Sequence, residues 1–476
     1  MEDLNEAKPL NAVLVNVQLP RVSDADREAS LDELARLVTT LGYNVIGRTS
    51  QRRSSERSAN VLGDGKLKDL AEWTGGTGEV QRFEAKKKHK AALRFEKNKT
   101  EEEDDIDFEE ISEEFIEETA PEDTSTITHE SHAEKAQIVI VDCDLSPSQL
   151  RNLESATGVP VLDRTGVIIE IFSRHARTRA ARLQVEIARL MYVAPRLRET
   201  GGGEDRGGGG IGGKGAGETT VELDKRKIRD RIKELKQEFA SIAREHDTRR
   251  ARREQEISVA LVGYTNAGKS SLMRALTSSD VYIADKLFAT LDTTVRVLYP
   301  ETKPKILISD TVGFIKKLPH SLVASFKSTL DEACNASLLL YVVDAADSTF
   351  RAQLEVTRSV LREVGAGEVE SLLVLNKVDR LALEELDALK AEFPDAIYLS
   401  ALNPEDVANL RLRLVKHFET AMVDTDVFIP YDVQGAVGEI RAKLKVLGEE
   451  YDERGVTLKV RAHQDDIKRI KTRFGI

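Results

Sequence analysis

One octapeptide constrains the fold more than any other part of the chain. Gly263-Tyr-Thr-Asn-Ala-Gly-Lys-Ser270 directly follows the apolar run Ile257 to Val262 and precedes the helix-like run Ser271 to Leu276. This is the P-loop pattern, in the strand, turn and helix context that the pattern requires. Its glycines allow backbone N–H groups to approach phosphates closely, and a helix N-terminus favours negative charge. We therefore expect a nucleoside triphosphate here, with Lys269 at the β and γ phosphates and Ser270 as a ligand of Mg²⁺.

A second motif, Asp310-Thr-Val-Gly313, follows the strand-like run Lys305 to Ser309. A carboxylate at such a strand end can hold a Mg²⁺-bound water, and the N–H of Gly313 can sense the γ-phosphate. The next residue is Phe314, whose side chain has no polar group to orient the attacking water. The sequence thus predicts slow intrinsic turnover, with the water positioned by a partner, by another segment or by backbone groups.

Two further motifs indicate which base is bound. Asn376-Lys-Val-Asp379 follows the apolar run Ser371 to Leu375, and Ser400-Ala-Leu402 follows Ile397 to Leu399. The Asp379 carboxylate suits the N1–H and N2–H₂ donors of guanine, which adenine does not present on that edge. A pocket built to hydrogen-bond one base rejects the other strongly, because its buried polar group would be left unpaired. The motifs therefore select GTP over ATP.

A mobile segment that brings a threonine to Mg²⁺ is expected between the P-loop and Asp310, and residues 286–294 occupy that place. Thr290 is the first choice, with Thr293 or Thr294 as alternatives, and plain turn chemistry is the competing interpretation. The predicted catalytic residues are Lys269, Thr290 and Gly313, and the predicted metal ligands are Ser270 and Thr290, with Asp310 through a water. The predicted GTP contacts are Gly263, Tyr264, Thr265, Asn266, Ala267, Gly268, Lys269, Ser270, Ser271, Phe288, Ala289, Thr290, Leu291, Asp292, Asp310, Thr311, Val312, Gly313, Asn376, Lys377, Asp379, Ser400, Ala401 and Leu402.

The periodicity predicts an α/β fold with several domains. Six strand-like runs alternate with helical runs over residues 255–424, as expected for a Ras-like P-loop GTPase domain. Residues 1–172 contain strand-like runs at Ala12 to Leu19 and Gln137 to Asp142 and a helical run at Ser30 to Leu41, which predict a small α/β domain. Residues 425–476 predict a small α+β domain with a strand at Val456 to Arg461.

Residues 173–254 predict a long antiparallel helical hairpin. One helix is expected from Ser173 to Arg198, followed by a tip loop at 201–217 in which eleven of seventeen residues are glycine. The second helix has an apolar stripe at Ile228, Ile232, Leu235, Phe239 and Ile242. Its many Lys and Arg residues between 225 and 253 fit a solvated helical face and an RNA-contacting surface about equally well.

Composition indicates the charge distribution and the expected cellular compartment of the chain. The formal net charge is −12, but residues 101–123 alone contain fourteen acidic residues, so the rest is nearly neutral. This stretch lies in a charged insertion at 79–134 that we expect to be disordered. Two cysteines without CxxC spacing fit a reducing cytosol, and no signal peptide or membrane span is found. We expect a cytoplasmic monomer.

The stretches GYTNAGKSSL (263–272), LFATLDTT (287–294) and DTVGFI (310–315) together resemble the HflX family of translation-associated GTPases. The likeness extends upstream to 62–70, 145–154, 161–190 and 215–232. It implies a Mg²⁺-dependent GTPase that docks on the large ribosomal subunit, is stimulated there, and in bacteria separates stalled ribosomes into subunits. It also implies that Thr290 senses Mg²⁺ and that the hairpin loop probes the peptidyl-transferase region of ribosomal RNA.

The chain departs from this pattern at the insertion, at the glycine tract 201–213 and at Thr293, where bacterial relatives commonly have Pro. These departures are compatible with an archaeal member of the family. Whether the N-terminal region binds ATP, as in some members of the family, also stays open. Two other functions also stay open, namely a GTPase of ribosome assembly and an RNA-binding or RNA-remodelling protein that nucleotide regulates. A metal-hydrolase or nucleophile-triad enzyme is disfavoured, since the eight histidines form no HExxH and no GxSxG occurs.

Overall fold

The computed structural model describes residues 9–56, 58, 60–80, 135–197, 220–251, 256–277, 287–288, 294–316 and 327–476. The chain divides into two compact units, one made of Met1–Arg174 and Arg182–Ala240 and the other of His175–Ala181 and Ser241–Ile476. Most of the charged insertion and the whole glycine-rich tip loop lie outside the described residues. Within the described residues, no helix combines the length and the apolar character needed to cross a membrane.

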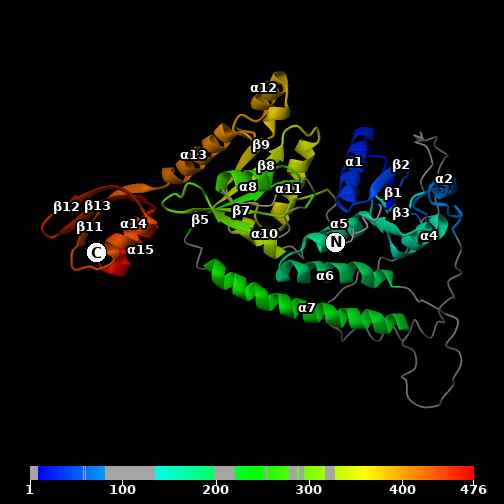
Figure 1. The fold of residues 1–476 in the computed structure, drawn as a ribbon, viewed down its shortest axis with the longest axis horizontal. Coiled ribbons are helices and arrows are strands. Elements are labelled where there is room, and N and C mark those ends of the chain that lie inside the picture. Colours follow the sequence, from blue (N-terminus) through cyan, green and yellow to red (C-terminus); the bar gives the residue numbers. More distant parts are fainter. Residues whose placement is uncertain are drawn as a thin grey trace, which may run out of the picture. The chain divides into compact units, whose positions relative to one another are not determined.

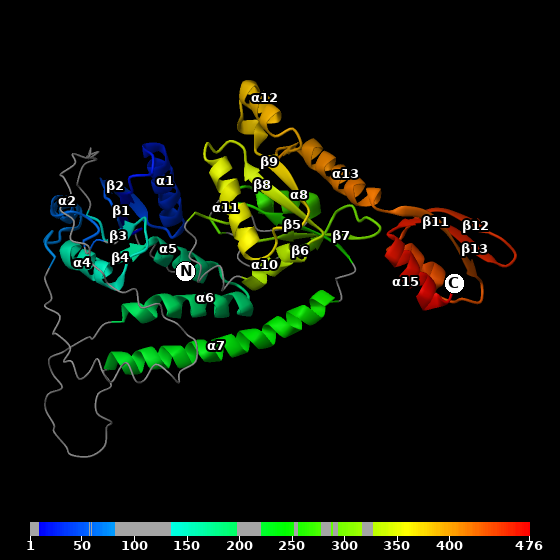
Figure 2. The ribbon, with the colours of Figure 1, turned by 180° about the vertical axis from the view of Figure 1, so that it is seen from behind.

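The first unit is built on a four-stranded parallel sheet in the order β2-β1-β3-β4, which confirms the predicted N-terminal α/β fold (Figures 1 and 2). Its strands are β1 (Asn11–Gln18), β2 (Asn44–Arg52), β3 (Ile138–Val141) and β4 (Val161–Asp163). Its helices are α1 (Asp24–Thr40), α2 (Asp64–Thr74), α4 (Pro147–Thr157) and α5 (Arg164–His175). β1 and β3 are buried almost throughout, as parallel strands covered on both faces require.

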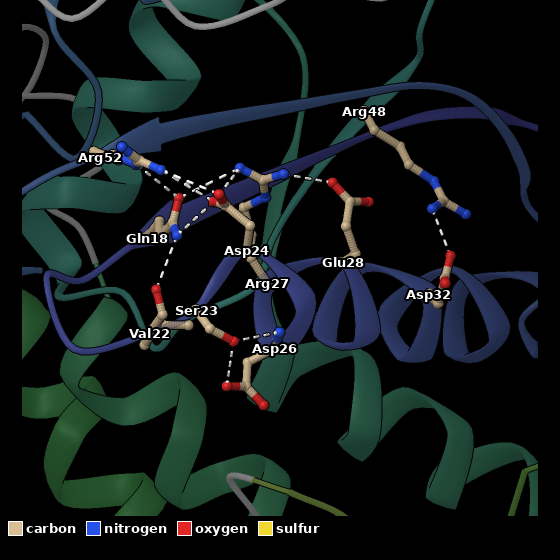
Figure 3. Close-up of polar contacts among 10 residues, drawn as sticks. All are labelled: Gln18, Val22, Ser23, Asp24, Asp26, Arg27, Glu28, Asp32, Arg48 and Arg52. Atoms are coloured by element: carbon tan, nitrogen blue, oxygen red, sulfur yellow. Dashed lines mark hydrogen bonds and ion pairs between the residues drawn. The ribbon is translucent and has the colours of Figure 1, made fainter. Parts of the chain in front are cut away.

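α1 begins six residues before the run that its apolar pattern predicts. The hydroxyl of Ser23 accepts a hydrogen bond from the Asp26 N–H at 3.1 Å and so caps the helix earlier. The carboxylate of Asp24 accepts hydrogen bonds from Gln18 and Arg52, which lower its pKa (Figure 3). This exposed network joins the start of α1 to the carboxyl ends of β1 and β2.

A buried ion pair lies deeper in the same unit. Arg164, which is 1% exposed, bonds Asp142 through Nη1 at 2.6 Å and Glu33 through Nη2. Asp142 also accepts a hydrogen bond from Asn16 Nδ2 at 2.8 Å. Three chain segments therefore meet at one buried guanidinium, and each charge depends on its partners because burial without pairing is costly.

The predicted continuous helix from Ser173 to Arg198 is wrong. α5 ends at His175, and α6 (Arg179–Val193) begins only after a break, followed by a 3₁₀ turn at Ala194–Arg196. Thr178 causes the new start, because its hydroxyl accepts the Ala181 N–H at 3.1 Å. The end of α6 is anchored by buried Asp163, which accepts hydrogen bonds from Tyr192 at 2.7 Å and Arg196 at 2.9 Å.

α7 (Thr220–Ala251) is the second helix of the predicted hairpin, and both ribbon views show it running beside α6 (Figures 1 and 2). Ile232 and Leu235 of the predicted apolar stripe are fully buried. Arg231 on α7 pairs with Glu186 on α6 at 3.1 Å. The hairpin interpretation is therefore confirmed for the described parts of both helices.

The second unit contains a six-stranded sheet in the order β10-β9-β8-β5-β7-β6, in which only β6 is antiparallel. Its strands are β5 (Ile257–Val262), β6 (Thr294–Val297), β7 (Ile306–Asp310), β8 (Leu338–Asp344), β9 (Ser371–Asn376) and β10 (Ile397–Tyr398). Its helices are α8 (Lys269–Thr277), α10 (Lys327–Cys334), α11 (Phe350–Glu363), α12 (Leu383–Glu392) and α13 (Pro404–Thr420). All six predicted strands are present, and the parallel ones end at one edge, where ligands bind in such folds.

The C-terminal residues form the predicted small α+β fold. An antiparallel sheet in the order β11-β13-β12 packs one face against two helices. These elements are β11 (Val423–Pro430), α14 (Ala436–Lys443), β12 (Lys445–Tyr451), β13 (Gly455–Ala462) and α15 (Gln464–Phe474).

Replacing Arg164 by Ala tests the buried ion pair. Because Asp142 would stay buried without its cation, we expect the first unit to lose about 3–5 kcal/mol of unfolding free energy. Trp73, the only tryptophan, is buried in this unit, so its fluorescence in urea reports the loss. The control is Arg48→Ala, which removes an exposed pair with Asp32 and should cost below about 1 kcal/mol. Equal losses in the two variants would contradict this assignment.

Candidate nucleotide-binding site

The loop between β5 and α8 has a backbone that only glycine tolerates at two positions. Gly263 and Gly268 have φ angles of +154° and +96°. A Cβ on Gly263 would lie 2.1 Å from the Val342 carbonyl oxygen, and one on Gly268 would lie 2.2 Å from Asn376 Nδ2. The glycines therefore let the loop lie against β8 and β9, and they fix its curvature.

The P-loop lysine is turned into its own loop. Lys269 is 6% exposed, and its ammonium donates to the carbonyls of Gly263 at 2.9 Å and Tyr264 at 2.8 Å. Burial lowers the pKa of Lys269 to about 8, while the negative charge of Asp310 opposes that shift. A buried cation at the mouth of a glycine loop is suited to an anionic ligand.

Two oxygen-bearing side chains, those of Asp310 and Ser270, lie near this lysine. Asp310 is fully buried at the end of β7, and Ser270 donates its hydroxyl to Asp310 Oδ2 at 2.7 Å. The following hydroxyl, that of Thr311, donates to the Leu261 carbonyl at 2.8 Å and ties the strand ends together. The predicted residues of the first two motifs are thus brought to one place.

Gly313 lies directly against the P-loop. A Cβ there would be 2.8 Å from Thr265 Cγ2 and 3.1 Å from Lys269 Nζ. Phe314 follows with its side chain buried, and its backbone pairs with the P-loop through the Phe314 N–H to the Gly263 carbonyl (3.1 Å) and the Thr265 N–H to the Phe314 carbonyl (2.8 Å). The aromatic side chain therefore packs in the protein interior, as expected for a side chain without a polar group.

Asn376 links the P-loop to the loop at residues 400–402. Its side chain is 1% exposed, donates to the Ala267 carbonyl at 2.8 Å and accepts the Ala401 N–H at 3.0 Å. Lys377, in the left-handed region at φ 63°, donates to the carbonyl of Asn266 at 2.8 Å and to Asp344 at 2.7 Å. Both motif residues thus support the P-loop from outside.

The other residues predicted to contact the base differ in their exposure. Asp379 is exposed in the 3₁₀ turn Val378–Arg380, and Leu402 is 83% exposed. Ser400 is buried, and its N–H donates to Asp406 at 2.8 Å. Asp379 and Leu402 are thus both accessible from solvent.

Sequence reasoning missed two supporting carboxylates, Asp344 and Asp406. Asp344 ends β8 between β5 and β9, and Asp406 lies in the first turn of α13. A carboxylate directly after an apolar run was a usable signal for Asp344, since neighbouring parallel strands end at one edge. Asp406 had no such signal.

Part of the predicted site lies outside the described residues. This applies to Ala289, Thr290, Leu291 and Asp292, whose roles therefore stay predictions. Phe288 is described, with φ 58° and a buried side chain. Ser271 and Val312 lie on α8 and in the segment after β7.

A mostly parallel sheet that gathers these motifs at one edge defines the class of P-loop GTPases. Three family descriptions match the chain in agreement with this class. They are "50S ribosome-binding GTPase" over residues 258–377, "GTP-binding GTPase N-terminal" over 28–81 and 121–173, and "GTP-binding GTPase Middle Region" over 175–253.

The chain is 56% identical to GTPase HflX of Gluconacetobacter diazotrophicus over 460 residues, which cover 97% of each chain. It is 38% identical to GTPase HflX of Escherichia coli over 341 residues, or 70% of this chain and 80% of that one. A solved GTP-binding protein from Sulfolobus solfataricus in complex with GDP has 22% identity and a TM-score of 0.40, covering 85% of this chain and 99% of that one. The chain belongs to the GTPase HflX family, so the predicted family and the predicted GTPase activity are confirmed.

Replacing Asn376 by Ala removes the link between the two sides of the site. Because the Ala267 carbonyl and the Ala401 N–H would lose a buried partner, we expect a loss of about 2–4 kcal/mol in unfolding free energy. Circular dichroism in urea should show the shift, while the Trp73 fluorescence transition stays in place. The control is Asn403→Ala, which removes one exposed helix cap and should cost about 1 kcal/mol. A loss no larger than the control's would refute the linking role.

Proposed function

We propose that this GTPase depends on Mg²⁺, binds the large ribosomal subunit, and couples GTP binding and hydrolysis to ribosome dissociation or recycling. The observation that carries the proposal is a network of contacts around the P-loop: hydrogen bonds join it to Asn376 and to the Phe314 backbone, and Gly313 packs directly against it. Such a network transmits the state of the phosphates to flanking segments, because each motif touches the next.

On the phosphate side, the N–H groups of residues 263–268 surround the β-phosphate and Lys269 exchanges its two loop carbonyls for phosphate oxygens. The exchange is favourable because a carbonyl is a weaker partner for an ammonium than a phosphate is. In this proposal the Gly313 N–H donates to the γ-phosphate. The support is that Gly313 lies close to the ammonium of Lys269, since a Cβ built on the glycine would be 3.1 Å from Lys269 Nζ.

The donors near Lys269 fit Mg²⁺. The Ser270 hydroxyl and the Asp310 carboxylate are hard oxygens 2.7 Å apart, of the kind that Mg²⁺ prefers together with waters and phosphate oxygens. In this proposal Ser270 and Thr290 are ligands and Asp310 holds a metal-bound water. When bound, the ion neutralises charge on the phosphates. Ser270 would leave its bond to Asp310 to reach it.

On the base side, the Asp379 carboxylate accepts from guanine N1–H and N2–H₂, and Ser400, Ala401 and Leu402 border the ring. The exposure of Asp379 and Leu402 supports this assignment, because a ligand can reach both side chains. Asn376 and Lys377 act by fixing the position of the P-loop, and Asn376 also holds the 400–402 loop.

Two observations support a ribosomal partner. The description matched by residues 258–377 is a 50S ribosome-binding GTPase. The described start of α7 exposes Lys225, Arg226, Lys227, Lys233 and Lys236. Cations on one helix release counterions when they approach phosphate backbones, which favours RNA. We assign RNA contact to the basic helix 225–253 and to the tip loop 201–217, and we propose a cytoplasmic monomer.

Two other functions make different predictions. A ribosome-assembly GTPase would leave mature ribosomes intact, whereas a splitting factor with GTP should convert them into subunits on a density gradient. An RNA-remodelling protein would keep its full ribosomal activity after deletion of residues 257–476. The proposed function requires that deletion to abolish activity.

Replacing Asp379 by Asn tests base recognition. Because the amide presents a donor to the donors of guanine, we expect GTP affinity to fall roughly 10- to 100-fold and xanthosine triphosphate to bind better. The measurement is titration of each nucleotide with the purified chain. The control Asp387→Asn changes an exposed carboxylate on α12 and should leave both affinities unchanged. Unchanged GTP affinity in the Asp379 variant would remove this residue from the pocket.

GTP hydrolysis with and without isolated large ribosomal subunits tests the partner. We expect weak turnover alone and strong stimulation by the large subunit. Deleting residues 203–213 should spare basal turnover and lower the stimulation, whereas deleting residues 101–111, an equal length of the acidic insertion, should not. Tight GTP binding without stimulation would exclude the large subunit as activator, and full stimulation without residues 203–213 would exclude the tip loop.

A further inference from the structure

We propose that the Tyr264 hydroxyl is a positioning group for GTP hydrolysis, because it anchors the backbone that follows Gly313. Tyr264 is the second residue of the P-loop, and its side chain is 6% exposed. Its phenolic oxygen accepts the backbone N–H of Lys316 at 2.6 Å. The P-loop thus reaches past Gly313 and Phe314 and holds the third residue beyond the glycine.

Two backbone hydrogen bonds complete the attachment. The Phe314 N–H donates to the Gly263 carbonyl, and the Phe314 carbonyl accepts the Thr265 N–H, so that Tyr264 and Phe314 form a short parallel bridge. The hydroxyl contact at Lys316 is the only side-chain contribution among these three bonds. Gly313 lies immediately before the attached stretch, so its position against Lys269 depends on all three.

The chemistry explains why this attachment matters. In hydrolysis a water oxygen bonds to the γ-phosphorus, the bond to the β–γ bridging oxygen breaks with its electron pair left on GDP, and a water proton passes to the phosphate released. Phe314 has no polar atom in its side chain and is buried. Of the three ways left to orient the attacking water, this inference takes backbone groups of the 313–316 stretch, and a backbone group works only when it is held in place.

The inference rests on the proposed location of the γ-phosphate at Gly313. It adds a specific atom, the Tyr264 oxygen, that does not touch the nucleotide. Loss of this oxygen should therefore alter hydrolysis and the preference for a γ-phosphate, and should leave recognition of GDP intact.

Tyr264→Phe removes the oxygen and keeps the buried ring. With a single buried hydrogen bond lost, we expect the single-turnover hydrolysis rate at saturating GTP to fall about five- to tenfold. The affinity for GDP should stay within about twofold, while the affinity for a non-hydrolysable GTP analogue falls. The control is Tyr398→Phe, whose hydroxyl bonds the carbonyls of Leu389 and Phe393 in the same domain, and which should hydrolyse GTP at the normal rate.

Lys316→Pro removes the same hydrogen bond from the donor side. If the bond is the cause, this variant is slow as well, and the double variant is no slower than the slower single one. Hydrolysis by Tyr264→Phe within twofold of the unchanged protein overturns the inference, and so does an equal loss of GDP and GTP-analogue affinity, which marks general damage to the P-loop. Failure of the proposed function is separate, because it appears in the unchanged protein as absent GTP binding or absent stimulation by large subunits.

Discussion

The hydrogen bonds of the Asn376 side chain hold the nucleotide site together. This residue ends β9, yet its amide bonds the carbonyl of Ala267 in the P-loop and the N–H of Ala401 beyond β10. One amide can serve both loops only because parallel strands end at the same edge of the sheet. The missing Cβ of Gly268 is equally necessary, since Asn376 Nδ2 occupies its space. The site is therefore a property of the sheet and not of any single motif.

Charge burial shapes how such a site works. Lys269 is held by its own loop carbonyls and lies near buried Asp310, so the structure holds a cation and an anion ready before any ligand arrives. Preorganised groups of this kind do not have to be ordered when the ligand binds. The same principle appears in the first unit, where Arg164 is held between Asp142 and Glu33. In both places partners from distant segments offset the desolvation of a buried charge.

Much of this arrangement could be predicted from the sequence, because it follows from local rules. The six strands of the nucleotide-binding sheet appear as short apolar runs, the P-loop as a short motif, and the apolar stripe of α7 as a helical repeat. The break at Thr178 escaped prediction because one side-chain cap overrode a continuous helical pattern. The contacts of Arg164 and of Tyr264 also escaped, since each joins residues whose proximity depends on strand order. The order of the strands in a sheet cannot be read from the periodicity of the sequence.

Equilibrium competition for a bound fluorescent GDP by GTP and by ATP, with Mg²⁺ and the purified full chain, tests the central claim most directly. The claim is that one sheet edge forms a single site for guanine nucleotides. GTP should displace the probe at concentrations at least about 100-fold lower than ATP, because an adenine ring leaves Asp379 without a donor. Displacement by ATP at the same concentrations as GTP would contradict the account.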